Sequence, residues 1–290
     1  MLVMPRVARL TAPNPSLMTG AGTNTYLFGD AELAIVDPGP DDAGHLDAIV
    51  AEAAAMGGRP SIILVTHSHV DHLPGAYALK RRLGLPIAAY ATIPEIDLPL
   101  RHDQRLTIGG QPVRALHTPG HAADHLCFLL EGEATLFSGD LIVGEGTVVI
   151  GRDGELDQYL ASLRSLLPLD LRRILPGHGP VIDEPRRKIE EYIAHRHDRE
   201  RQIVAALQAG AATPRQLVEA VYVDVDPRLY PVAEQTVAAH LRKLQREGRV
   251  DLYDGDGEVK YELAGGAGVG GPTGRGPAGR RAGGGGWAGG

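Results

Sequence analysis

Cysteine is almost absent from this sequence, and its scarcity excludes several kinds of site. The single Cys127 among 290 residues excludes an intramolecular disulfide and any metal site built on a cysteine cluster. The longest apolar runs, such as residues 62–65, are far too short to span a bilayer, so we expect no membrane partner. Residues 1–16 contain three prolines and no continuous apolar stretch, unlike a secretory signal, so the expected location is cytoplasmic.

Acidic residues outnumber basic residues, and glycine is in excess at one end of the chain. The net charge of −7 argues against non-specific nucleic-acid binding by the whole chain. Residues 265–290 hold 14 of the 38 glycines, three arginines and no acidic residue. This composition cannot bury enough apolar surface to offset the entropy of ordering, so we predict a disordered Gly/Arg tail. Without the tail's three positive charges the rest of the chain carries −10.

Short strands and helices alternate through the first 184 residues, which predicts an α/β domain of two sheets with helices outside them. Strands are predicted at 25–28, 32–36, 61–66, 86–90, 107–108, 113–117, 126–130, 134–138 and 173–175, and helices at 45–56, 74–83 and 156–167. From residue 185 a long charged helix at 186–207 is followed by helices at 214–221 and 231–247 and a hairpin at 250–263. That order is typical of a winged helix, so the predicted units are 1–184, 185–264 and the tail at 265–290.

Four potential metal ligands occur within six residues, directly after the strand predicted at 61–66. They are His67, His69, Asp71 and His72. In an extended backbone His67 and His69 point to the same side, and the chain then turns Asp71 and His72 over the same spot. A packed core rarely concentrates titratable groups, so this cluster predicts a metal or catalytic site.

Three further ligand types, His121, Asp140 and His178, each follow a glycine turn at the end of a later strand. The seven residues divide into two groups of three and one bridging carboxylate: His67, His69 and His121; Asp71, His72 and His178; and Asp140. A carboxylate can bridge because it has two oxygens. Imidazole and carboxylate without thiolate suit zinc, and also manganese or iron; we expect two divalent ions, with zinc favoured.

Two metals about 3.5–4 Å apart would share a hydroxide with a pKa near about 7, and that hydroxide would attack a carbonyl or phosphorus atom. We expect Asp71 also to orient the hydroxide. The ligand pattern resembles that of the metallo-β-lactamase superfamily, an αββα sandwich with its metals at one sheet edge, from Leu10 to Asp183. The resemblance implies that Asp37 supports the metal ligands without binding the metal itself. His125, four positions after His121, is a second candidate for such support.

Residues 22–27, 118–125, 136–147 and 176–182 resemble the beta-lactamase-like protein two subfamily, through to a C-terminal winged-helix-like domain. Its animal members are described as mitochondrial endoribonucleases, so the resemblance implies hydrolysis of single-stranded RNA. The same site would suit a thioester, as in hydroxyacylglutathione hydrolase, or a lactone, because a fold does not fix a substrate. A third alternative is a non-enzymatic regulator that binds nucleic acid.

Two residues are candidates for substrate contact, each with a structural alternative. Asn24 could polarise a substrate oxygen or cap a local turn, and Thr147 could lie beside the substrate or in a simple loop. Residues 196–264 carry ten Lys/Arg and twelve Asp/Glu, which is not the charge of a strong DNA-binding domain. The cations at 242, 243, 246 and 249 could hold phosphates or satisfy helix carbonyls. We expect this domain to shape the active-site cleft or to form the contact of a homodimer.

Overall fold

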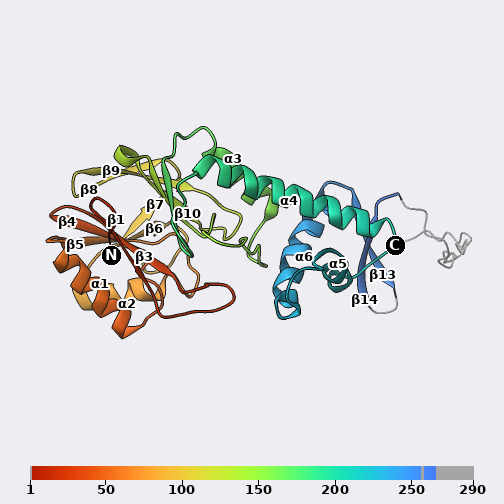
Figure 1. The fold of residues 1–290 in the computed structure, drawn as a ribbon, viewed down its shortest axis with the longest axis horizontal. Coiled ribbons are helices and arrows are strands. Elements are labelled where there is room, and N and C mark those ends of the chain that lie inside the picture. Colours follow the sequence, from red (N-terminus) through yellow and green to blue (C-terminus); the bar gives the residue numbers. More distant parts are fainter. Residues whose placement is uncertain (1, 256–257, 266–290) are drawn as a thin grey trace, which may run out of the picture.

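The structure, a computed structural model, describes residues 2–255 and 258–265 (Figure 1). The predicted tail lies outside the described residues apart from Gly265. Across the described part of the chain, no helix combines the length and the apolar character needed to cross a bilayer.

A seven-stranded sheet forms the first half of the N-terminal domain, with its strands in sequential order. The strands are β1 (Leu2–Met4), β2 (Val7–Thr11), β3 (Asn24–Gly29), β4 (Glu32–Val36), β5 (Arg59–Leu64), β6 (Ile87–Tyr90) and β7 (Leu98–Leu100). Strands β4 to β7 run parallel, and helices α1 (Ala43–Ala55) and α2 (Pro74–Leu83) connect them. Both helices pack their apolar side chains on one face of this sheet.

A five-stranded sheet forms the second half, in the order β12-β11-β10-β9-β8. Its strands are β8 (Gln104–Ile108), β9 (Gln111–His117), β10 (Leu126–Leu130), β11 (Thr135–Gly139) and β12 (Arg173–Pro176). A 3₁₀ turn at Glu131–Glu133 links β10 to β11, and helix α3 (Leu156–Leu166) links β11 to β12. Helix α3 covers the outer face of this sheet.

The two sheets pack face to face around an apolar core, which completes the αββα sandwich. Successive residues of β10 point to opposite faces of the second sheet. Phe128 lies in the core between the sheets, and Leu129 packs under α3. The Phe28 and Phe137 rings stack across the sheet interface with centroids 5.2 Å apart. The predicted fold class is therefore confirmed for this domain.

Three of the short strands, β1, β2 and β7, were not predicted. Strand β7 lies at the edge of its sheet and contains Pro99, which lacks the N–H group that an inner strand would need. Strand β2 follows Arg6, whose φ of 62° interrupts the extended backbone just before it. Such strands are defined by their neighbours in the sheet more than by their own apolar pattern.

The C-terminal domain has the predicted winged-helix order. It comprises α4 (Pro185–Leu207), α5 (Pro214–Val221), a 3₁₀ turn (Pro227–Leu229), α6 (Tyr230–Arg246), β13 (Val250–Gly255) and β14 (Glu258–Leu263). The capping box of Thr213 and Gln216 starts α5. A separate apolar core forms between the end of α4, α5, α6 and β13. The predicted boundary at residue 184 stays a prediction, because α4 belongs to both cores.

Helix α4 joins the two domains (Figure 1). Its first turns place Ile189 and Tyr192 in the core of the sandwich, whereas Ile203 and Leu207 lie in the winged-helix core. The buried Tyr192 hydroxyl accepts a hydrogen bond from the Val143 N–H and lies 3.1 Å from the Val143 carbonyl oxygen. The loop after β11 is thereby tied to the helix.

We expect Tyr192→Phe to lower the free energy of unfolding by about 1–3 kcal/mol, because the buried Val143 N–H loses its partner. Urea unfolding measures the change. Tyr77→Phe is the matched control: the Tyr77 hydroxyl bonds to the Pro94 carbonyl at an exposed site, so its loss should cost less than about 0.5 kcal/mol. Equal effects of the two substitutions would contradict the anchoring role of Tyr192.

Candidate metal centre

The seven predicted ligands come from loops at one edge of the sandwich. His67, His69, Asp71 and His72 lie between β5 and α2. His121 follows β9, Asp140 follows β11 and His178 follows β12. Because β11 and β12 are parallel neighbours, the loops after them emerge at the same edge. The order of the strands thus brings together predicted ligands that lie up to 111 positions apart in the sequence.

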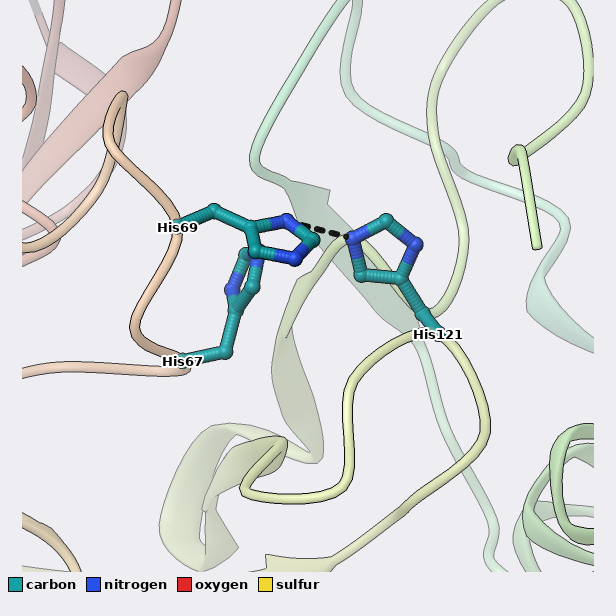
Figure 2. A group of neighbouring side chains, drawn as sticks. All are labelled: His67, His69 and His121. Carbon is teal, nitrogen blue, oxygen red and sulfur yellow. Dashed lines mark hydrogen bonds between the residues drawn. The ribbon is translucent and has the colours of Figure 1, made fainter. Parts of the chain in front are cut away.

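The structure brings these side chains within metal-binding distance of one another. Three groups each have ligand atoms within 4.8 Å of one another: His67, His69 and His121; Asp71, His72 and His178; and His67, His72 and Asp140. Figure 2 shows the first group, in which the His69 Nδ1 and His121 Nε2 atoms are 3.1 Å apart. The first two groups are the two sets of three that the sequence predicted.

Asp140 lies between the two sets. Its carboxylate oxygens are 3.3 Å from His178 Nε2, 3.5 Å from His72 Nε2 and 3.7 Å from His121 Nε2. A carboxylate in contact with members of both groups is placed to bridge two cations. Its bridging role, like the ligand roles of the other six residues, stays a prediction.

Hydrogen bonds behind the cluster fix how His67 and His72 present their rings. The Asp37 carboxylate accepts from the Thr66 N–H at 2.8 Å and from the Thr66 hydroxyl at 2.7 Å. It also accepts from His72 Nδ1 at 2.9 Å. Because the Thr66 hydroxyl gives its proton to Asp37, it accepts from His67 Nδ1 at 3.0 Å. In the neutral rings, both Nε2 lone pairs therefore face the cluster.

His121 and His178 are oriented in the same way by backbone carbonyls. The Nδ1 of His121 donates to the Val149 carbonyl at 3.0 Å, and the Nδ1 of His178 donates to the Gly22 carbonyl at 3.2 Å. Metal-binding histidines typically donate their second ring nitrogen to a carbonyl or carboxylate, which fixes the tautomer. Both Nε2 atoms are left to act as ligands.

Unpartnered polar atoms support the fit of cations to this cluster. His67 Nε2, His72 Nε2 and Asp140 Oδ1 are buried and have no hydrogen-bond partner among the described residues. Burying such atoms unsatisfied is costly, and all three belong to the same ligand group. Nitrogen and oxygen donors with these three orphaned atoms fit divalent metal ions.

Charge neighbours shift the pKa values of the cluster strongly. Burial opposes ionisation of Asp140, but the adjacent His178 and other imidazoles outweigh it and lower the pKa of its carboxyl well below the usual range. The hydrogen bond from His178 likewise overcomes burial and lowers the pKa of Asp71 to about 2. Asp140 raises the pKa of His178 to about 9 against the effect of burial. A bound cation must therefore compete with a proton for His178.

His125 lies beside Asp140, as its predicted supporting role requires. The His125 ring is fully buried, and its Nε2 accepts a hydrogen bond from the Asp140 N–H at 3.1 Å. Its Nδ1 lies 2.9 Å from the Thr118 hydroxyl. The ring holds the backbone of Asp140 and is not among the groups able to hold a metal in the described part of the chain.

The two predicted substrate residues have different environments. Thr147 is exposed on the wall of the cavity described below. Asn24 is buried, and its amide donates to the Pro176 and Gly179 carbonyls while its oxygen accepts from Thr11. These contacts engage the Asn24 amide with the loop of His178, which is neither the polarisation of a substrate nor the capping of a local turn.

Two residues of the site were not predicted. Thr66 links Asp37 to His67, and its only signal was its position immediately before the ligand cluster. Asp153 accepts from His69 Nε2 at 2.9 Å, which leaves the His69 Nδ1 atom to face His121. Asp153 lies in the loop before α3, and nothing in its spacing pointed to His69.

A cavity of about 980 Å³ opens beside the cluster, between the sandwich and the winged helix. Its volume is at the upper end for small-molecule sites, which span about 300–1,000 Å³. His69 and Asp71 line one wall, and the winged-helix residues Val225, Leu229 and Val232 line another. The expectation that the C-terminal domain shapes the cleft agrees with this placement.

Comparison with known proteins identifies the class. Residues 18–178 match the metallo-beta-lactamase superfamily, and residues 213–257 match the beta-lactamase associated winged helix domain. The chain therefore belongs to the metallo-beta-lactamase superfamily, whose members are generally hydrolases.

Individual relatives cover nearly the whole chain. A beta-lactamase-like protein 2 homolog from Drosophila melanogaster is 39% identical over 90% of this chain and 97% of its own length. An atrochrysone carboxyl ACP thioesterase from Aspergillus fumigatus is 37% identical over 76% of this chain and 75% of its own. A metallo-beta-lactamase family protein from Thermus thermophilus superimposes with a TM-score of 0.71 at 27% identity, covering 90% of this chain and all of that one.

We expect Asp37→Asn to weaken metal binding about 10–100-fold, because an amide cannot accept from Thr66 and His72 at both of its heavy atoms. Competition with a chromogenic chelator measures the affinity. Asp41→Asn is the control, since Asp41 is exposed and pairs only with Arg81, at 3.4 Å, among the described residues. Unchanged affinity in Asp37→Asn would show that Asp37 does not orient the ligands.

Proposed function

We propose that this protein is a binuclear metal-dependent hydrolase of thioesters or related esters, with zinc as the favoured metal. The observation that carries the proposal is the pairing of the His/Asp cluster with an apolar cavity. Hydrolysis is the common activity of the superfamily, and one relative is named as a thioesterase. Single-stranded RNA, the substrate implied by the sequence resemblance, is the second candidate.

The cavity wall suits an acyl group better than a polynucleotide. Val143 and Val148 of the sandwich and Val225, Leu229 and Val232 of the winged helix all line the cavity. Apolar walls with a few polar groups are typical of sites that enclose small molecules. Single-stranded RNA sites instead combine cationic grooves with stacked aromatic side chains.

The cations predicted as phosphate contacts are already paired within the chain. Arg242 donates to the Gly151 and Gly154 carbonyls, both at 3.2 Å. Arg246 pairs with Glu155 at 2.8 Å. Lys243 and Arg249 likewise pair with acidic residues of the winged-helix domain. The RNA alternative rests on the match to a winged-helix domain and gains no free cation from the end of α6.

The chain's own residues supply orientation and proton acceptance. Divalent ions bound to the cluster would polarise the substrate carbonyl and lower the pKa of a water molecule. Asp71 is 22% exposed and lines the cavity, which supports the proposal that its carboxylate accepts a proton from the attacking water and orients it. Asp37, Thr66 and His125 hold the ligands so that the site needs little rearrangement on binding.

We expect Asp140→Ala to reduce the metal content from two ions to about one per chain and to lower kcat/KM at least 100-fold, because the two halves lose their shared carboxylate. Elemental analysis and steady-state kinetics measure the two effects. Asp251→Ala is the control, an exposed change on β13. Full metal content together with full turnover in Asp140→Ala would refute the assignment.

A substrate panel separates the two candidate functions. We expect hydrolysis of a medium-chain acyl thioester that Asp140→Ala abolishes, and no cleavage of a labelled single-stranded RNA above the rate of that variant. The reasons are the largely apolar lining of the cavity and the pairing of the cations at the end of α6 within the chain. The opposite pattern, with Asp140-dependent RNA cleavage and no thioester turnover, would reject the thioester proposal and assign the RNA alternative.

A further inference from the structure

Two arginines on the α4 wall of the cavity lack an acidic partner. Arg196 and Arg199 are three positions apart, so they share one face of α4, and both line the cavity with the metal cluster. Neither forms an ion pair with another described residue. The acids of this part of the helix are engaged elsewhere, Asp198 with Arg201 and Glu200 with Lys243 and Arg249.

Arg196 is the more deeply buried of the two. Its side chain is 2% exposed, although burial of a charge without a counter-ion is costly. Its guanidinium donates to the Val148 carbonyl and lies 5.2 Å from the centre of the Tyr159 ring. Its Nε atom has no hydrogen-bond partner within the described ranges. A carbonyl dipole and a ring compensate only part of a full charge.

Arg199 lies over an aromatic ring. Its guanidinium is 3.9 Å from the centre of the Tyr222 ring, and its Nη1 donates to the Val221 carbonyl at 2.7 Å and to the Gln202 side-chain oxygen at 2.8 Å. Its buried Nε is also without a partner in the part of the chain that the structure describes. Stacking on a ring covers one face of a guanidinium and leaves its edge, which carries the N–H groups, to meet a ligand.

Two desolvated guanidinium groups beside one cavity match an oxyanion. Arginine binds carboxylate and phosphate oxygens with paired N–H donors, and such charge-assisted bonds are strong where water is excluded. We propose that Arg196 and Arg199 form an anion-binding subsite that holds a carboxylate or phosphate group of the substrate while its scissile bond lies at the metal cluster. This inference rests on the proposed function, since it names a second part of the same substrate.

In a thioester the anionic group can belong to the acyl part or to the thiol part. A set of four substrates distinguishes these two cases. The acyl part is hexanoyl or adipoyl, the second of which ends in a carboxylate. The thiol part is pantetheine or 4′-phosphopantetheine. We expect wild type to prefer one anionic member over its neutral counterpart at least tenfold in kcat/KM, and the preferred member identifies whether acyl carboxylate or carrier phosphate is bound.

Arg199→Gln should abolish that preference through a loss of kcat/KM for the preferred anionic member. Arg196→Lys keeps the charge but removes the planar fork, and it should reduce the preference without loss of the fold, as circular dichroism will show. Arg201→Gln, an exposed arginine on the same helix, is the control and should behave as wild type. An unchanged preference in Arg199→Gln would overturn the inference.

A binding measurement separates this inference from the proposed function. Calorimetric titration of the protein as purified with adipate and with 4′-phosphopantetheine needs no turnover. We expect at least one of these probes to bind, with a Kd that rises tenfold or more in Arg199→Gln and is unchanged in Arg201→Gln. Equal binding by wild type and Arg199→Gln would refute the subsite even if thioesters are hydrolysed. Arg199-dependent binding without thioester turnover would refute only the proposed function.

Discussion

The Asp37 carboxylate makes the interaction on which the candidate metal centre depends. It accepts from the backbone and the hydroxyl of Thr66 and from the ring of His72, and through Thr66 it also sets the tautomer of His67. Asp37 has a φ of 47°, a left-handed backbone that costs free energy for a residue with a side chain. The three hydrogen bonds offset that cost, and they fix two fully buried histidines before any ligand arrives.

The close approach of the loops imposes a second constraint. A Cβ atom on Gly177 would lie 2.6 Å from Asp140 Oδ1, and one on Gly139, whose φ is 46°, would lie 2.7 Å from the Thr66 hydroxyl oxygen. Both glycines are therefore required by space, and Gly139 also by its positive φ. Because the loops meet this tightly, a small shift of one loop would displace ligands of both groups at once.

The sequence was sufficient for the parts of the molecule that local chemistry determines. The apolar pattern predicted α2, β4, β10 and α5 at their observed bounds, and the ligand types after strand ends predicted which residues would gather. The sequence was insufficient where a residue's environment is determined by neighbours that are distant in the sequence. Asp153 meets His69 across 84 positions, and Arg196 is buried because Val148 and Tyr159 lie over it.

The charges of the winged helix explain why this domain acts as a wall of the cavity. A helix that grips nucleic acid keeps its cations free for phosphates, whereas Arg242 and Arg246 are used to dock α6 on the loop before α3 and on α3 itself. That docking accompanies the presence of apolar side chains of the domain on the lining of the cavity that also contains His69 and Asp71. Positive charge without an acidic partner then remains on the α4 face, inside the cavity. The cavity thus combines a candidate metal-binding cluster, apolar side chains and two arginines without an acidic partner among the described residues, and the proposed substrate assignment rests on this combination.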